Sequence, residues 1–144
     1  MAADDAATAW KKRSEECLLG AKDEFAQARY NNAAARSYWA AYHAAIMLLT
    51  HENVDPDREM WRHEDVWRDF DALVGRKAEF SNLVGALSFL NEHRVRADYT
   101  RGGASLVDAE EALRRARETV SAVMGWVEVS SDRARPAEEE TTEV

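Results

Sequence analysis

The sequence predicts an all-α protein folded as an up-down bundle of about five helices. Alanine, the strongest helix former, supplies 26 of the 144 residues. The chain holds only 6 glycines and 2 prolines, too few for the many tight turns of a β-sandwich. Apolar residues recur at spacings of three and four, which is the period of an amphipathic helix.

The first two helices are expected over residues 5–28 and 33–51. In the first, Trp10, Cys17 or Leu18, and Phe25 share one face. A short turn at residues 30–32 follows, and Asn32 suits the N-cap of the next helix. The second helix is apolar nearly all round, so we expect it to be the buried centre of the bundle.

Three further helices are expected over residues 64–74, 79–98 and 106–127. Gly75 ends the third, and the glycine pair at 102–103 breaks the chain after the fourth. Ser105 and Asp108 have the spacing of a capping box for the fifth. Its seam steps by three and four through Leu106, Ala109, Leu113, Ala116, Val120, Val123 and Val127.

We expect the chain to divide into a bundle, residues 1–129, and a disordered acidic tail, residues 130–144. Residues 128–144 hold six acidic and two basic residues, so half of the net charge of −8 lies at this end. The remaining net charge is also negative, which excludes a broadly basic nucleic-acid surface. Because the tail offers little to bury, truncation after Glu128 is expected to leave the melting temperature unchanged.

Several functional classes find no support in the sequence. The single cysteine, Cys17, excludes an intrachain disulfide. Residues 1–9 are short, acidic and weakly apolar, so no signal peptide is expected. The longest apolar run, residues 38–49, is too short to span a bilayer, so we expect a cytoplasmic protein without membrane contact. No cofactor motif occurs, and Glu59 with His63 offers too few ligands for a metal, so no metal site and no cofactor are expected.

Arg94 is the most informative residue. The apolar stripe of the fourth helix includes Leu87 and Leu90, and the next step of four reaches Arg94. A charge on such a stripe must be paired or reach solvent, and Asp98, four residues on, can lie beside it. One interpretation is a structural ion pair that ends a helix. The other is a phosphate site, because the guanidinium fork matches phosphate oxygens.

Two segments together resemble the HEPN family of small all-α prokaryotic domains. Residues 35–45, Ala-Arg-Ser-Tyr-Trp-Ala-Ala-Tyr-His-Ala-Ala, resemble the family's Arg-x-Tyr-Tyr-x-x-Phe-His-Ala helix. Residues 94–99, Arg-Val-Arg-Ala-Asp-Tyr, resemble its Arg-x-x-Ala-Asp-Tyr helix ending. Trp61-Arg62-His63 stands where the family has a histidine-containing loop. The order of the motifs matches from about residue 10 to residue 127.

The resemblance implies a homodimeric helical bundle, and for many members a metal-independent ribonuclease toxin neutralised by a small nucleotidyltransferase. The family's catalytic motif is an arginine followed, after four to six residues, by histidine. Arg94 matches the arginine, but the four histidines, His43, His51, His63 and His93, all lie before it. Asp98 stands near the place of the missing histidine, and a carboxylate paired with arginine is a poor base.

Three functions therefore remain open. The first is an RNA- or nucleotide-binding HEPN module of a toxin–antitoxin or defence system, without catalysis. The second is a ribonuclease toxin in which Arg94 and Asp98 are catalytic, or in which His63 or His93 acts across a dimer cleft. The third is a purely structural helical protein. The expected RNA- or nucleotide-binding residues are Arg94, Arg96, Tyr99, Arg36, Tyr38 and His63.

Further expectations concern the assembly of the protein and the roles of His43 and Cys17. Five tryptophans are more aromatic surface than a thin bundle readily buries, which, with the resemblance, predicts a homodimer. A small nucleotidyltransferase is the partner that the resemblance implies. His43, within the apolar second helix, is expected to be a core histidine and Cys17 a buried apolar residue.

Overall fold

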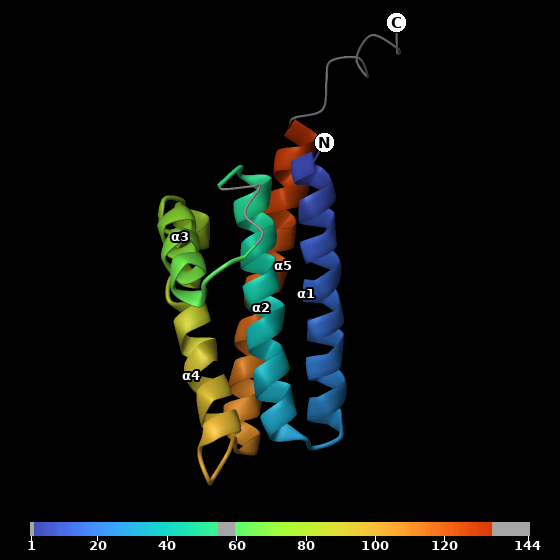
Figure 1. The fold of residues 1–144 in the computed structure, drawn as a ribbon, viewed down its shortest axis with the longest axis vertical. Coiled ribbons are helices and arrows are strands. Elements are labelled where there is room, and N and C mark those ends of the chain that lie inside the picture. Colours follow the sequence, from blue (N-terminus) through green and yellow to red (C-terminus); the bar gives the residue numbers. More distant parts are fainter. Residues whose placement is uncertain (1, 55–59, 134–144) are drawn as a thin grey trace, which may run out of the picture.

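The computed structural model describes residues 2–54 and 60–133, and within these ranges the chain is helical without strands. Figure 1 shows the helices of the bundle side by side, with α3 at one end. The elements are α1 (Ala2–Ala26), α2 (Tyr30–His51), α3 (His63–Gly75), the 3-10 helix η1 (Ala78–Leu83), α4 (Ala86–Tyr99) and α5 (Leu106–Arg133). The predicted all-α fold with five α-helices is confirmed.

Helix α2 is the centre of the bundle, as its all-round apolar sequence predicted. It packs against α1, α4 and α5, and the chain runs alternately up and down through α1, α2, α4 and α5 (Figure 1). The many alanines of α2 let its neighbours approach closely. The largest fully buried side chains of the core are Tyr38, Phe70, Ile46, Met47, Leu48, Leu49, Leu83, Leu87, Leu90, Val66, Val74 and Val123.

The connection between α1 and α2 differs from the prediction. Helix α2 begins at Tyr30, three residues before the expected start, because the reversal occurs at Ala28, which has a φ of 59°. Asn32 is therefore inside the helix and caps nothing. Its neighbour Asn31 instead accepts a hydrogen bond from the backbone N–H of Ala104, 2.7 Å away, and so ties this turn to the α4–α5 loop.

The single helix predicted over residues 79–98 is in fact two elements. Residues 78–83 form the 3-10 helix η1, and α4 begins only at Ala86. Gly85 separates them with a φ of 83°, a left-handed conformation that no α-helix interior contains. The carboxylate of Asp71 accepts the Gly85 N–H at 3.1 Å and holds this break against α3.

Helix α5 starts where the sequence predicted but ends later. The predicted capping box is confirmed, because Ser105 Oγ accepts the Asp108 N–H and the Asp108 carboxylate accepts the Ser105 N–H, each at 3.1 Å. At the other end the helix continues to Arg133, beyond the expected boundary at 129. The rest of the predicted tail lies outside the described residues.

Two surface features bear on earlier expectations. All five tryptophans are at least half-buried in the single chain, so surplus tryptophan surface is not a reason for dimerisation. The large apolar side chains that are exposed near the α4–α5 loop are Val95, Tyr99, Leu106 and Val107. None of the described helices has the length and apolarity needed to cross a membrane.

Candidate functional site

Arg94 extends from α4 toward the aromatic residues of α2. Its side chain is 16% exposed, in keeping with its place after the buried Leu87 and Leu90 on the α4 stripe. The guanidinium carbon lies 5.1 Å from the ring centre of Tyr38 and 5.4 Å from that of Trp39. Cation–π attraction to two rings holds this positive charge at the edge of the core.

Polar neighbours on α4 fix the orientation of the guanidinium. Asn91 Oδ1 accepts hydrogen bonds from Nε and Nη2 of Arg94, at 3.2 and 2.8 Å. The predicted pairing with Asp98 is present but loose, because Nη1 lies 3.7 Å from Asp98 Oδ2. Asp98 is 39% exposed, so water weakens this ion pair. Nη1 is thus the least tightly held donor of Arg94.

Tyr38 and His63 complete the cluster from two other elements. Tyr38 is fully buried on α2, and His63 is the first residue of α3. The Tyr38 hydroxyl oxygen lies 2.5 Å from His63 Nδ1 and also accepts a 3.0 Å hydrogen bond from Trp67 Nε1. The His63 ring stacks on Tyr42 with its centre 4.7 Å away and is nearly parallel to Tyr38. We call Arg94, Tyr38 and His63 the Arg94 cluster.

The hydrogen bonds of Tyr38 decide the tautomer of His63. The indole N–H of Trp67 can only donate, so the Tyr38 oxygen accepts from it. The hydroxyl proton of the buried Tyr38 then needs an acceptor, and His63 Nδ1 is within reach. Nδ1 therefore accepts, and the neutral imidazole carries its own proton on Nε2. His63 can thus donate a hydrogen bond through Nε2, while its basic nitrogen is occupied.

The local electrostatics keep these groups in their neutral forms. Burial, and then the positive charge of Arg94, lower the pKa of His63 below its ordinary value. Burial raises the pKa of the Tyr38 hydroxyl well above its ordinary value. At neutral pH the cluster therefore consists of one cation, Arg94, beside a neutral imidazole and a neutral phenol.

The structure does not bring the other expected site residues into this cluster. Arg96 points toward α5, where its Nη1 binds Asp108 Oδ1 at 3.2 Å. Tyr99 is 76% exposed at the end of α4. Arg36 is exposed on α2, where it lines a shallow depression with Trp39, and its stem lies against Gly20 of α1.

The remaining histidines do not serve the Arg94 cluster. His93 is buried against α5, where its Nε2 lies 3.5 Å from Glu111 Oε2. His43 is partly buried between Trp10 and Trp39, and its Nδ1 lies 3.8 Å from Cys17 Sγ. Burial lowers the pKa of His43 to about 4 and raises that of the Cys17 thiol, so this pair is neutral and unreactive.

Sequence reasoning missed the residues that support the cluster. Three aromatic residues that the sequence did not single out, Trp39, Tyr42 and Trp67, contact His63 or Arg94. Asn91 fixes the guanidinium and stands three residues before Arg94, a spacing that places both on one helix face. That spacing in the sequence was the signal that could have identified Asn91 as a partner of Arg94. Glu59, which the sequence analysis considered with His63 as a metal ligand, lies outside the described residues.

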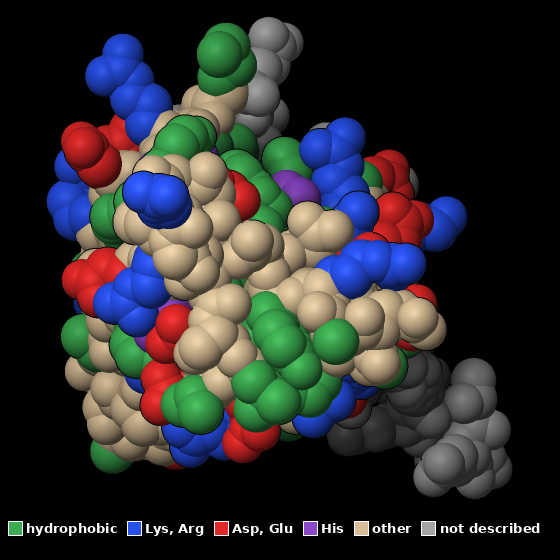
Figure 2. Space-filling view, turned by 90° about the horizontal axis from the view of Figure 1, so that it is seen from below, with side chains coloured by type: hydrophobic (Ala, Val, Ile, Leu, Met, Phe, Trp, Pro, Cys, Tyr) green, Lys and Arg blue, Asp and Glu red, His purple; other side chains and the backbone are tan. Residues whose placement is uncertain are grey.

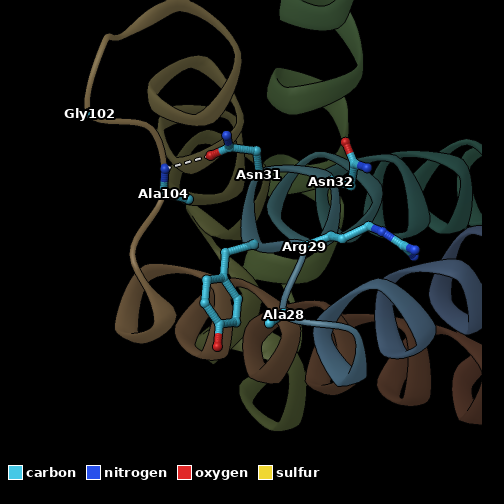
Figure 3. A pocket seen from close by; sticks show the side chains of 7 residues that line it. Ala28, Arg29, Asn31, Asn32, Gly102 and Ala104 are labelled. Carbon is cyan, nitrogen blue, oxygen red and sulfur yellow. Dashed lines mark hydrogen bonds between the residues drawn. The ribbon is translucent and has the colours of Figure 1, made fainter.

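A second depression lies at the opposite end of the bundle from α3 and is less suited to chemistry. It is formed by the α1–α2 turn and the α4–α5 loop, and Figure 3 shows the Asn31 side chain crossing it to the backbone of Ala104. Figure 2, which views this end of the molecule, shows acidic and basic side chains interspersed around an apolar patch. This face thus carries no continuous basic surface.

Comparison with known proteins gives two matches. The family model described as "HEPN domain" matches residues 7–128, nearly the whole described bundle. Among curated proteins, the chain is similar to "Putative toxin MJ0605" of Methanocaldococcus jannaschii. The two are 29% identical over 104 residues, which cover 72% of this chain and 75% of that protein.

Proposed function

We propose that this chain, which belongs to the HEPN family, is a toxin-type protein that binds RNA or a nucleotide through a phosphate group without cleaving it. Arg94 supplies the positive charge, and the Nε2–H of His63 supplies a second donor. The similarity to a protein named as a toxin supports the biological setting. The Arg94 cluster supports the chemistry.

The observation that carries this proposal is the Tyr38–His63 hydrogen bond. Metal-independent RNA cleavage needs a base for the 2′-hydroxyl, and imidazole suits that task. Here the basic nitrogen of His63 already accepts the Tyr38 proton. Asp98, the other candidate base, is a partly exposed carboxylate whose Oδ2 lies 3.7 Å from Nη1 of Arg94, so its position is that of an ion-pair partner. The hydrogen bond thus leaves His63 suited to donating to a phosphate through Nε2, and Asp98 suited to orienting Arg94.

The central experiment compares binding and cleavage of a 5′-labelled single-stranded RNA. Arg94→Ala should weaken binding by about tenfold or more, since a charge-assisted hydrogen bond in a shielded site contributes roughly 1.5 to 3 kcal/mol. Arg94→Lys should restore only part of the affinity, because the planar fork is lost. Arg117→Ala, at an exposed position of α5, removes the same charge and should change binding little.

The same RNA tests the ribonuclease alternative. The wild-type protein should leave the RNA intact during an incubation in which it is fully bound. Specific cleavage that disappears in His63→Gln or Asp98→Asn would replace our proposal with the ribonuclease. Binding that is unchanged in Arg94→Ala, with a lowered melting temperature, would instead assign Arg94 a structural role.

We further propose that the protein acts in the cytoplasm as a homodimer and meets a nucleotidyltransferase-type antitoxin. Membership of the family is the support for both partners. The exposed apolar side chains Val95, Tyr99, Leu106 and Val107 offer surface for such contacts. Sedimentation at tens of micromolar should show a dimer, and a monomer at that concentration would contradict this part of the proposal.

A further inference from the structure

A second cluster of polar side chains lies on the face of α4 that packs against α5. His93 of α4 meets Asp108 and Glu111, which stand one turn apart on α5. One ligand atom from each residue lies within 4.8 Å of the other two. His93 is only 7% exposed, whereas the two carboxylates are partly exposed, so the cluster is reachable from solvent.

The hydrogen bond of His93 to the backbone directs its second ring nitrogen toward Glu111. Nδ1 lies 3.0 Å from the backbone oxygen of Phe89, which can only accept, so Nδ1 carries the proton. In the neutral ring the Nε2 lone pair then faces Glu111 Oε2 at 3.5 Å. Without a proton on Nε2, two acceptors face each other beside a buried ring, and a positive charge between them, either a proton or a metal ion, stabilises the arrangement.

The geometry around His93 shares two features with metal-binding histidines, a backbone partner for Nδ1 and a carboxylate oxygen near Nε2. Donation of the other ring N–H to a backbone carbonyl fixes the ring and is the usual support for such a ligand. The 3.5 Å between Nε2 and Glu111 Oε2 is close to the ~3.3 Å that separates neighbouring ligands around a tetrahedral zinc ion with bonds of ~2.0 to 2.1 Å.

The charges and the second carboxylate fit the same ligand. Asp108 is held in place by the Ser105 capping box and by Arg96, so its position costs little to organise. The cluster holds two carboxyl groups, of Asp108 and Glu111, against the one guanidinium of Arg96, and this excess of acidic groups attracts a cation. An imidazole nitrogen with carboxylates favours zinc-like ions over magnesium or calcium, which prefer oxygen alone.

We propose that His93, Asp108 and Glu111 bind one divalent transition-metal ion of the zinc type and thereby clamp α4 to α5. Three protein ligands leave the fourth position of a tetrahedral ion to water. The site is separate from the Arg94 cluster, which faces α2, and the proposal does not depend on RNA binding. The sequence led us to expect no metal site, because only residues close together in the sequence, Glu59 and His63, were compared as ligands.

The test uses the metal-free full-length protein without an affinity tag. Cobalt(II) is added while visible absorption is followed, and zinc is then used to displace it. One equivalent of cobalt should produce the strong absorption of four-coordinate geometry. Zinc should raise the melting temperature, and magnesium at the same concentration should not. Glu111→Gln should weaken zinc binding by about tenfold or more, since losing a ligand costs at least as much as losing a supporting group.

Controls separate this site from other metal-binding groups. Glu110→Gln changes an exposed neighbour on α5 and should leave zinc binding unchanged. Glu111→Gln retains its carbonyl oxygen and the helix, so its circular dichroism should match the wild type, and it serves if His93→Phe fails to fold. Absence of stoichiometric cobalt binding would overturn the proposal, as it would show that a proton joins His93 to Glu111. Loss of binding in Cys17→Ser with retention in Glu111→Gln would also overturn it.

Discussion

Replacing Tyr38 by phenylalanine removes one oxygen at the centre of the Arg94 cluster. The ring, its stacking on Tyr42 and its contact with Arg94 are retained. The hydroxyl's two hydrogen bonds, from Trp67 Nε1 and to His63 Nδ1, are lost. The variant therefore isolates the hydrogen bonds from the packing of a fully buried side chain.

The expected loss of stability follows from those two bonds. A net hydrogen bond contributes about 0.5 to 1.5 kcal/mol, and a donor left unpaired adds a desolvation cost, reduced here because Trp67 is only partly buried. A total of about 2 kcal/mol is expected. For a domain of this size, that corresponds to a fall in melting temperature of roughly 4 to 8 °C.

The more discriminating readout is the pKa of His63, followed by NMR. In the wild type, the Tyr38 hydroxyl donates to Nδ1 and so stabilises the neutral ring. Its removal should raise the pKa of His63 in Tyr38→Phe. If His63 instead donates from Nδ1 to Tyr38, the same substitution should lower the pKa, and our assignment of the tautomer would be refuted. Tyr42→Phe, which leaves the Tyr38–His63 bond intact, is the matched control.

Three further predictions test other parts of the structure. RNA affinity should be constant between about pH 6.5 and 8, because the lowered pKa of His63 keeps its ring neutral in this range. A several-fold fall in affinity with rising pH would mean that protonated His63 binds the phosphate. His43→Phe should make stability less dependent on pH on the acid side. In the folded wild type the pKa of His43 is about 4, so between pH 6.5 and 4 the folded state binds fewer protons than the unfolded chain, and its free energy of unfolding falls by at most about 3 kcal/mol. Chemical denaturation at several pH values would measure this fall and its loss in the variant. Gly103→Ala should lower the free energy of unfolding by about 1 to 3 kcal/mol in thermal melts, because Gly103 has a φ of +64° and a Cβ there would lie 2.6 Å from Asn31 Oδ1. Gly102→Ala is the control and should have little effect, because a Cβ at Gly102 would meet open space.

Helix periodicity carried the fold prediction because burial in a bundle depends on repeating spacings. The all-round apolar sequence of α2 and the stripes of α4 and α5 identified their buried residues, except that Leu106, the first residue of the predicted α5 seam, is exposed. The Ser105–Asp108 spacing placed the start of α5. Boundaries failed where one backbone conformation decides the path. The left-handed Gly85 splits the predicted fourth helix, and Ala28 adopts a positive φ that its residue type does not suggest.

The candidate site was predictable only in part, because its geometry depends on contacts between distant segments. The inward direction of Arg94 followed from its place on the α4 stripe. The hydrogen bond from Tyr38 to His63 joins residues 25 apart through a connection whose path local pattern does not specify. The His93 cluster likewise appears only when α4 lies against α5, since Asp108 and Glu111 are 15 and 18 residues beyond His93 in the sequence.

The central claim is that Arg94 and His63 together bind a phosphate group. The most direct measurement follows the side-chain NMR signals of both residues while a short single-stranded RNA is added. We predict that Arg94 Nε–H and the His63 ring shift together and saturate at the same RNA concentration, with the RNA still intact at the end. The account would be contradicted by shifts confined to Arg96, Arg101 and Tyr99 at the exposed end of α4, with the signals of Arg94 and His63 unchanged.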